Sequence, residues 1–493
     1  MDPAQYYDLA PIDGKIYYMK HVAGESKNSL CVFDVAGKDK KETVIGEADG
    51  FEISADHKKM SVKKGASYYV IDLPTTKLEL TTAVNLSDMK ISVNKKEEWM
   101  QIFNEAWRQM RDFFFSPTMN GVDWKAIHDK YAVLVPSVNH RADLDYIIGE
   151  MIGELNSGHA YVSGGDIPRA ERINMGLLGA KLSRDASGYY RIDKILQGAN
   201  FDKELRSPLT EVGVNVHTGD YIISINGVAT TTTNDIYTLL VNTAGKQVEL
   251  EVNGKPSPDG AHKAIVVPVS TEKELYYYNW VEHNIHFVDS VSGGKIGYIH
   301  VPDMGVEGLN EFMKHFYPQI NRKALIIDDR GNGGGFVSPL IAERLAKQLV
   351  YFNMSRNQTQ GTPNPDIQLG PKACLINQYS ASDGDIFPFR FKTYKLGKLI
   401  GKRTWGGVVG IRGSLPFVDG GGLTKPEFTF YKADGFVIEG HGVDPDIEVD
   451  NDPADEYAGI DAQLNRAIEE LLNELKTNPQ NVPAIPPFPD KSK

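Results

Sequence analysis

Apolar and polar residues alternate in short runs over the first 88 residues, with turns rich in Gly and Asp between them. Residues 15–19, 29–35 and 67–73 are examples of such runs. A period of two is typical of strands with one buried face. The pattern predicts a β-rich domain over residues 1–88. Its size corresponds to about one or two four-stranded blades, fewer than a closed propeller needs.

A helical period replaces this alternation at about residue 99. Apolar residues recur three or four positions apart in two stretches, Trp99, Ile102, Phe103, Ala106, Trp107, Met110, Phe113 and Phe114, and then Leu144, Ile147, Ile148, Met151, Ile152 and Leu155. Such spacing puts the apolar side chains on one face of a helix. A further helix is expected to start near Asp123, between the two stretches. We therefore predict a helical part of the catalytic core over residues 89–171, with His159 at a helix-to-strand junction.

Strand-like runs return over residues 172–272. The loop Gly176, Leu177, Leu178 and Gly179 opens this segment, and the pair Asn226-Gly227 is typical of a tight hairpin turn. A short helix is expected near residues 233–241. Any small β-domain would fit this pattern. A sharper interpretation is a module whose glycine-rich loop and edge strand bind an extended peptide by strand addition.

Strands and helices alternate over residues 273–476, which predicts an α/β domain with a partly parallel sheet. We expect strands at 295–300, 324–328 and 373–377, and helices at 308–317, 339–349 and 460–475. Residues 477–493 are rich in Pro and should form an extended tail. The fold class is thus multidomain α+β, with segments 1–88, 89–171, 172–272, 273–476 and 477–493.

The composition excludes several classes of function. The net charge is −12 and no basic stripe stands out, which argues against a nucleic-acid partner. The chain has 2 cysteines, Cys31 and Cys374, which cannot form a CxxC or zinc pattern. Glu282, His283 and His286 are a poor metal site because their segment is interpreted as a strand. We expect neither a metal nor another cofactor.

Targeting signals are also absent from the sequence as given. No window approaches 18 apolar residues, so we expect no membrane span. The N-terminus has no basic region followed by an apolar one. A cytoplasmic location fits the chain as given, and a periplasmic or exported one would fit if a signal sequence had been trimmed.

The most informative local feature is a serine where a strand passes into a helix. The strand 373–377 is followed by a turn of small residues that contains Ser382. A hydroxyl there lies at a helix N-terminus, where N–H groups and the helix dipole favour negative charge. The N–H groups of Ser382 and Asp383 could bind an oxyanion. The alternative is that Ser382 only caps the following helix.

A glycine-rich loop and a histidine complete a candidate site. The strand 324–328 ends in a loop whose Gly334 or Gly335 could supply another oxyanion donor. His159, one of 12 histidines, is the candidate base because small residues surround it, and Glu439 could orient its ring. The chain has no GxSxG, HExxH or GxxxxGK[ST] motif, which argues against an α/β-hydrolase, a zincin and a P-loop NTPase.

Six motifs in this order resemble the C-terminal processing peptidase and tricorn family of serine peptidases. They are residues 157–161 (SGHAY), the 219–227 stretch of a PDZ-like module, 329–335 (DRGNGGG), 380–384 (SASDG), 403–407 (RTWGG) and 442–446 (GVDPD). The resemblance covers about residues 90–475. It implies a ClpP/crotonase-like catalytic domain, a PDZ-like peptide-binding domain that uses the Gly176–Gly179 loop, and the last blades of a β-propeller before residue 88.

The family contains two catalytic designs, and this sequence favours one of them. Processing peptidases use a Ser–Lys dyad, but Gly407 occupies the lysine position here and Lys402 lies on the wrong side of the turn. The tricorn-like set of Ser382, His159 and Glu439 is therefore favoured. Tricorn has a serine directly before the histidine, where this chain has Gly158. Either Ser157 or a water replaces that link, or Glu439 reaches His159 directly.

The resemblance implies a serine peptidase that acts on peptides or unfolded polypeptides through an acyl-enzyme on Ser382. Relatives also imply a homo-oligomer, a trimer or a hexamer. Tricorn's preference for basic residues is not carried over, because the corresponding stretch near residues 351–354 has no acidic residue. The alternative is a catalytically impaired protein that binds peptides through the PDZ-like module.

Overall fold

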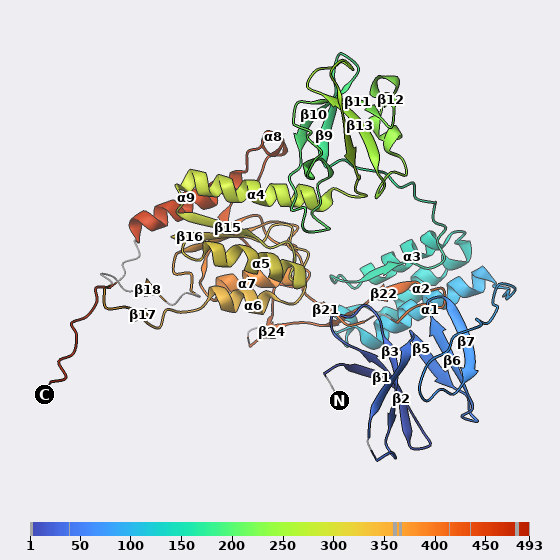
Figure 1. Cartoon of the computed structure of the whole chain (residues 1–493). Coiled ribbons are helices and arrows are strands. Elements are labelled where there is room, and N and C mark those ends of the chain that lie inside the picture. The colour runs from blue at the N-terminus through green and yellow to red at the C-terminus, as the bar shows by residue number, and fades with distance from the viewer. Residues whose placement is uncertain are drawn as a thin grey trace. The chain divides into compact units, whose positions relative to one another are not determined.

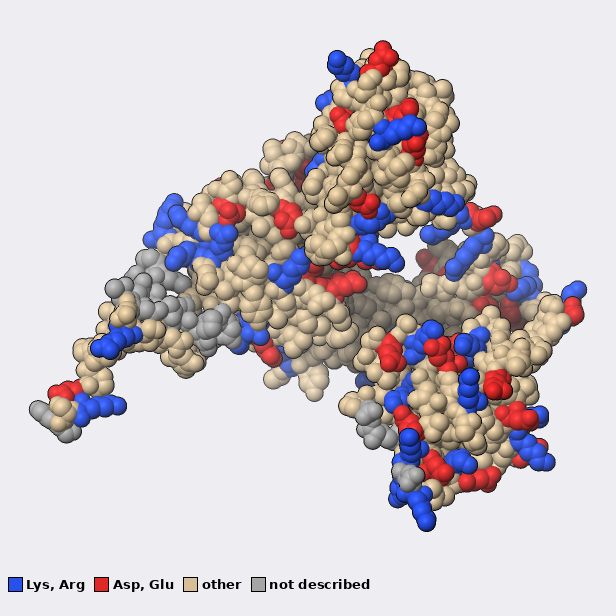
Figure 2. All heavy atoms as spheres, in the orientation of Figure 1, with Lys and Arg blue, Asp and Glu red and all other residues tan. Residues whose placement is uncertain are grey.

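The computed structural model describes residues 3–38, 40–357, 362–363, 367–413, 415–433, 435–478 and 483–492. Two compact units make up the chain, Met1–Asn94 and Lys95–Lys493. In the described part of the chain, no helix combines the length and the apolar character needed to cross a membrane. On the face drawn in Figure 2, basic and acidic side chains are interspersed, without a continuous basic stripe.

The first unit consists of two antiparallel sheets (Figure 1). The four-stranded sheet contains β1 (Gln5–Ile12), β2 (Lys15–His21), β3 (Ser29–Asp34) and β4 (Glu42–Glu47), and the three-stranded sheet β5 (Gly50–Ile53), β6 (Lys59–Lys64) and β7 (Ser67–Asp72). Tyr17, Leu30, Met60 and Val62 belong to one shared core. The β-rich character predicted for residues 1–88 is confirmed, and their assignment to a propeller stays a prediction.

The second unit begins with a helical region. It contains α1 (Lys95–Phe113), η1 (Met119–Gly121), α2 (Trp124–Ala132), η2 (Val135–Ser137) and α3 (Arg141–Gly153). The Asp123 carboxylate caps α2 by accepting from Ala126 N–H, and a capping box with Asp143 begins α3. The apolar faces predicted from the sequence form one core, which includes Phe103 and Ile148. After α3 the chain passes His159 and enters β8 (Tyr161–Ser163), which pairs with β22 (Gly422–Thr424).

A separate β-domain follows. Its strands are β9 (Ala180–Arg184), β10 (Tyr190–Ile195), β11 (Tyr221–Ile225), β12 (Val228–Ala229), β13 (Val248–Asn253) and β14 (His262–Val266), and its short helices are η3 (Pro208–Thr210), η4 (Thr230–Thr232) and η5 (Ile236–Leu240). The strand order is β14-β13-β11-β10-β9. Asn226 and Gly227 both have positive φ between β11 and β12, as the predicted tight turn requires.

A parallel sheet organises the remaining part. Its order is β15 (Ile296–His300), β16 (Ala324–Asp328), β19 (Lys372–Ile376), β20 (Gly397–Gly401) and β26 (Ile447–Glu448). Helices α4 (Lys273–Ser292), α5 (Val306–Gln319), α6 (Ser338–Leu345), α7 (Asp383–Thr393), α8 (Pro453–Tyr457) and α9 (Ala462–Thr477) alternate with the strands. Short pairs complete it: β17 (Phe352–Asn353) with β18 (Thr362–Pro363), β21 (Gly410–Ile411) with β23 (Pro426–Phe428), and β24 (Tyr431–Lys432) with β25 (Gly435–Phe436).

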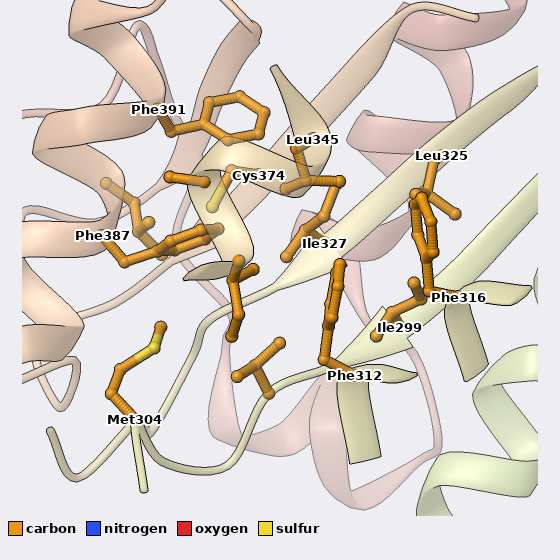
Figure 3. Close-up of a cluster of buried hydrophobic side chains, with 14 of the residues drawn as sticks. Ile299, Met304, Phe312, Phe316, Leu325, Ile327, Leu345, Cys374, Phe387 and Phe391 are labelled. Carbon is orange, nitrogen blue, oxygen red and sulfur yellow. The ribbon is translucent and has the colours of Figure 1, made fainter. Parts of the chain in front are cut away.

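Both faces of this sheet are buried, since successive strand residues point to opposite sides. Leu325 and Ile327 of β16 pack with α5, α6 and α7 through residues such as Phe312, Leu345 and Phe387 (Figure 3). Ala324 and Ile326 of the same strand pack with α4 and α9 on the other face. This arrangement fixes the ends of β16 and β19, where the candidate site residues begin.

Two sequence predictions about this region are wrong. The segment with Glu282, His283 and His286 is part of α4 and not a strand. Its aromatic residues favour a strand, but Val281, Asn284 and Val288 are buried at helical spacing. The helix predicted over 339–349 ends at Leu345, beyond which Leu349 is partly exposed. In the Pro-rich tail, residues 483–492 have no regular secondary structure, and Pro479 lies outside the described residues.

Candidate active site

Ser382 lies at the junction between β19 and α7 in an unusual backbone conformation. We call residues 377–382 the nucleophile turn. Ser382 has φ of 60° and ψ of −119°, a region that non-glycine residues seldom occupy. It is the N-cap residue of α7, but its side chain makes no capping hydrogen bond. The hydroxyl of the half-buried Ser382 is therefore not used to cap the helix.

The glycine-rich loop after β16 packs directly against this turn. Asn332 connects them: its carbonyl oxygen accepts from Ala381 N–H at 2.9 Å, and its Oδ1 accepts from Gly334 N–H at 2.9 Å. A Cβ on Gly334 would lie 2.6 Å from the Cβ of Ser382. The loop thus fits the turn only because residue 334 has no side chain.

Backbone N–H groups in this region differ in what they bind. The N–H of Gly334, one of the two expected oxyanion donors of the loop, donates to Asn332 Oδ1. The N–H groups of Gly335 and Asp383 donate to no protein acceptor among the described residues, whereas the Ser382 N–H donates to the Asp385 carboxylate and opposes the rise of its pKa. The Asp383 side chain accepts from Ser338 N–H at 2.9 Å, which links α7 to α6.

His159 lies in a mostly buried position against an aromatic side chain. Its φ is 59°, and its ring centroid is 5.6 Å from that of Trp405. Its Nδ1 is buried and has no hydrogen-bond partner in the described part of the chain. Burial lowers the pKa of His159 below its ordinary value, and the nearby Glu439 carboxylate opposes that effect. The imidazole is therefore mainly neutral at neutral pH.

Glu439 binds the backbone around His159 and not its ring. Its Oε1 accepts from Gly158 N–H at 3.1 Å, and its Oε2 accepts from the N–H groups of Val408 at 2.7 Å and Val409 at 2.9 Å. Among the described residues, the Ser157 hydroxyl donates to the Gly158 carbonyl alone, at 3.4 Å. Ser157 therefore makes no link between Glu439 and the imidazole. No hydrogen bond joins Ser382 Oγ to His159 within the described residues.

The loop 404–409 makes hydrogen bonds to several segments of the candidate site. Trp405 N–H donates to the Ser380 carbonyl at 3.0 Å, and Gly406 N–H donates to Asp385 Oδ1 at 2.7 Å. On its other side, the Gly406 carbonyl accepts from Gly440 N–H at 2.8 Å. The loop therefore connects the nucleophile turn with the segment that carries Glu439.

The sequence interpretation missed two buried carboxyl groups near the nucleophile turn, those of Asp385 and Asp329. Burial raises the pKa of Asp385 to about 6. Asp329 is fully buried, and neither of its side-chain oxygens has a partner in the described part of the chain. Burial, together with the charges of Asp328, Asp385 and Asp383, raises its pKa far above the ordinary value. The Ser-x-x-Asp spacing of Ser382 and Asp385, three residues apart as in a capping box, is a signal that could have identified Asp385.

Two further titratable side chains of this region, Lys402 and His441, contact other partners. Lys402 Nζ pairs with Glu448 at 2.8 Å, and His441 Nε2 lies 2.8 Å from Asp444. Neither is held near Ser382 by a hydrogen bond. Among the described residues, no group of three or more His, Cys, Asp or Glu side chains could hold a metal ion.

Comparison with known proteins identifies the relatives. Three family models match: the tricorn protease C1 domain at residues 95–153, the tricorn protease PDZ domain at 176–271 and peptidase family S41 at 295–449. Tricorn protease homolog 1 of Streptomyces coelicolor is 37% identical over 98% of this chain. The chain belongs to the tricorn group of peptidase family S41. Tricorn protease of Thermoplasma acidophilum is 35% identical over 99% of the chain.

Solved structures agree with this assignment to the tricorn group. The crystal structure of the tricorn protease has a TM-score of 0.86 and covers 97% of this chain at 35% identity. The chain spans about half the length of these relatives, 47% of the Streptomyces protein, 46% of the Thermoplasma protein and 47% of the crystallised chain.

The PDZ domain of this tricorn homologue contains the segment Gly176 to Gly179, whose role as a peptide-binding loop stays a prediction. Gly176 N–H donates to the Leu240 carbonyl, and Leu177 pairs with Val269 through both backbone groups. Leu178 is buried. Gly179 N–H donates to a carboxylate oxygen of Glu272 at 2.6 Å. Sequence interpretation missed Glu272, because its contact with Gly179 is far from local.

Proposed function

We propose that this chain carries the catalytic centre of a serine peptidase that hydrolyses oligopeptides or unfolded polypeptides through an acyl-enzyme on Ser382. The observation that carries the proposal is the conformation of Ser382. Its hydroxyl makes no capping hydrogen bond, and Ser382 packs against the loop at Gly334, where the N–H groups of Asp383 and Gly335 donate to no other described residue. Strained nucleophile turns with such donors are suited to acyl transfer.

In the proposed reaction, Ser382 Oγ attacks the carbonyl carbon of the scissile peptide bond and its proton passes to His159. The negative charge on the carbonyl oxygen is bound by the N–H groups of Gly335 and Asp383. The C–N bond breaks as His159 gives the proton to the departing amine. A water molecule then attacks the ester carbonyl carbon and loses a proton to His159. The ester bond to Ser382 Oγ breaks, and His159 gives that proton to Oγ. His159 suits the role of base because its lowered pKa keeps it neutral.

Glu439 has a positioning role in this proposal. Its three backbone hydrogen bonds hold Gly158, directly before His159, and the neighbouring loop at Val408 and Val409. The negative charge also favours the protonated imidazole that forms during the reaction, since it raises the pKa of His159. Ser157 has no contact in the structure that assigns it a step.

Hydrolysis of a fluorogenic oligopeptide library tests the proposal. The chain should turn over at least one peptide, and Ser382→Ala should lower kcat by a factor of about 10³ or more. Ser290→Ala, on the exposed face of α4, is the matched control and should leave the rate unchanged. Turnover that survives in Ser382→Ala would contradict the proposal. An assembly into trimers or hexamers stays a prediction for the same preparation.

One observation favours a second function, a peptide-binding protein without turnover. No acceptor among the described residues binds His159 Nδ1 and fixes its tautomer, and serine peptidases with a disturbed orienting residue lose much of their rate. This alternative predicts peptide binding by the wild-type chain without any hydrolysis. Binding and turnover measured on the same peptides separate the two functions.

A further inference from the structure

One face of the first turns of α4 contacts the PDZ domain. Glu272, the N-cap residue, is followed on this face by Leu275, Tyr276 and Asn279, at the i, i+3, i+4 and i+7 spacing of neighbours on a helix. Asn279 exchanges two hydrogen bonds with the backbone of Gln197, at 3.0 and 2.8 Å. The contact is thus a defined helix face with a carboxylate at its N-terminal end.

Other side chains on this face of α4 pack near the Gly176–Gly179 loop. A Cβ on Gly179 would lie 3.5 Å from Leu275 Cδ1. Lys181 of β9 places its Nζ 5.7 Å from the ring centroid of Tyr276. The first turns of α4 therefore cover the junction between the Gly176–Gly179 loop and β9.

The carboxylate of Glu272 is held by two backbone N–H groups. Its Oε1 accepts from Gly179 at 2.6 Å and from Ala180 at 3.3 Å. Burial raises the pKa of Glu272, and the two N–H groups oppose that effect. A pair of convergent N–H groups at a glycine-containing loop is a typical binding site for a carboxylate.

This carboxylate site lies at the start of an edge strand. Ala180 begins β9, the outermost strand of its sheet, whose order is β14-β13-β11-β10-β9. Within the described residues, β9 pairs with β10 alone, so its other edge can accept an extended peptide. Burial raises the pKa of Tyr237 of η5, and the nearby Glu272 carboxylate adds to that effect. An extended peptide paired with β9 would bring its C-terminal carboxylate to the position of Glu272 Oε1.

We propose that Glu272 is an internal ligand of a peptide-carboxylate site at Gly179 and Ala180, and that a peptide C-terminus binds there only by displacing it. The ligand class is a peptide with a free C-terminal carboxylate and an extended backbone. The inference does not depend on the activity of Ser382, so binding is measured on the chain that carries Ser382→Ala.

Fluorescence polarisation with labelled peptides that end in Leu, Val or Phe tests this inference. Each peptide is used as the free acid and as the C-terminal amide. In the Ser382→Ala background, Glu272→Ala should increase the affinity for the acids by about tenfold or more, because the competing carboxylate is gone. Affinity for the amides should stay unchanged. Glu272→Gln, which keeps the size of the side chain, should give a smaller gain of the same kind.

Glu274→Ala is the matched control. It removes a carboxylate two residues along the same helix whose side chain is 44% exposed and pairs with Lys273 and not with the loop. It should leave every affinity unchanged. Equal affinities for the acids with and without Glu272, or an equal gain for acids and amides, would overturn the proposal.

Hydrogen exchange shows whether each variant is folded and whether the two amides are bound. Amide exchange at Gly179 and Ala180 should become faster in Glu272→Ala and slow again when an acid peptide is added. Global exchange should match that of the parent chain. Exchange at these two amides that is the same with and without Glu272 would also contradict the proposal.

Discussion

The carboxylate of Glu439 accepts from the N–H of Gly158, the residue directly before His159, at 3.1 Å. It therefore fixes the peptide group that carries the histidine, while the imidazole Nδ1 remains without a partner in the described part of the chain. A Cβ at position 158 would lie 3.4 Å from Glu439 Oε1 and 3.0 Å from the Cα of Gly407. Glycine at this position permits the close approach of the loop that contains Gly407.

Glu439→Gln should lower kcat by about two orders of magnitude. The carboxylate oxygens accept three N–H groups, from Gly158, Val408 and Val409. A glutamine has one acceptor oxygen, so its NH₂ group would face at least one of these donors. The measurement is kcat on a peptide that the wild-type chain cleaves. A variant with wild-type kcat would show that Glu439 has no positioning role.

The pH dependence of kcat/KM should report His159. Because burial lowers its pKa, the rate should rise with pH through a midpoint below 6.5 and be fully developed at neutral pH. The Glu439 charge raises that pKa, so Glu439→Gln should move the midpoint to still lower pH. A midpoint above 6.5, or a shift to higher pH in the variant, would contradict the assignment of His159 as the base.

Gly334→Ala should reduce kcat by about 100-fold or more. The new methyl group would lie 2.6 Å from Ser382 Cβ and 3.2 Å from Asp383 N, at a φ of +86° that disfavours alanine. The neighbouring Gly333→Ala is the control, because a Cβ there meets no atom within 4 Å. Equal activity of the two variants would show that close packing of the loop on Ser382 is not required.

Asp385 should make stability depend on pH. Its folded pKa is about 6 and its ordinary value 3.8, so its contribution is fully present below about pH 4 and is lost as pH rises through 6. The loss amounts to about 3 kcal/mol of unfolding free energy. Urea unfolding at pH 4 to 7.5 measures it. Asp385→Asn should flatten the curve in this window, whereas the exposed Asp193→Asn should not.

Some of the site could be predicted from local sequence. The apolar run before the turn and the small residues within it place Ser382 between a strand and a helix, and helical spacing places His159 after α3. These features depend on residues adjacent in the chain, which is why pattern alone predicts them.

The remaining features depend on contacts between distant segments. Glu439 and Gly158 are 281 positions apart, and Glu272 and Gly179 are 93 apart. The spacing of apolar residues along the sequence carries no information about such distant pairs. The direction of the Gly334 N–H is set by the Asn332 side chain, and α4 is helical because its packing on the sheet overrides the strand preference of its aromatic residues. Tertiary structure decides all of these.

Intact-mass spectrometry after treatment with a serine-reactive fluorophosphonate tests the central claim most directly. An activated nucleophile attacks the phosphorus and becomes covalently phosphonylated, whereas an ordinary serine does not react. We predict a single adduct, located on Ser382 by peptide mapping and absent from Ser382→Ala. A well-folded chain that gains no adduct, or an adduct that persists in Ser382→Ala, would contradict the account of Ser382 as the nucleophile.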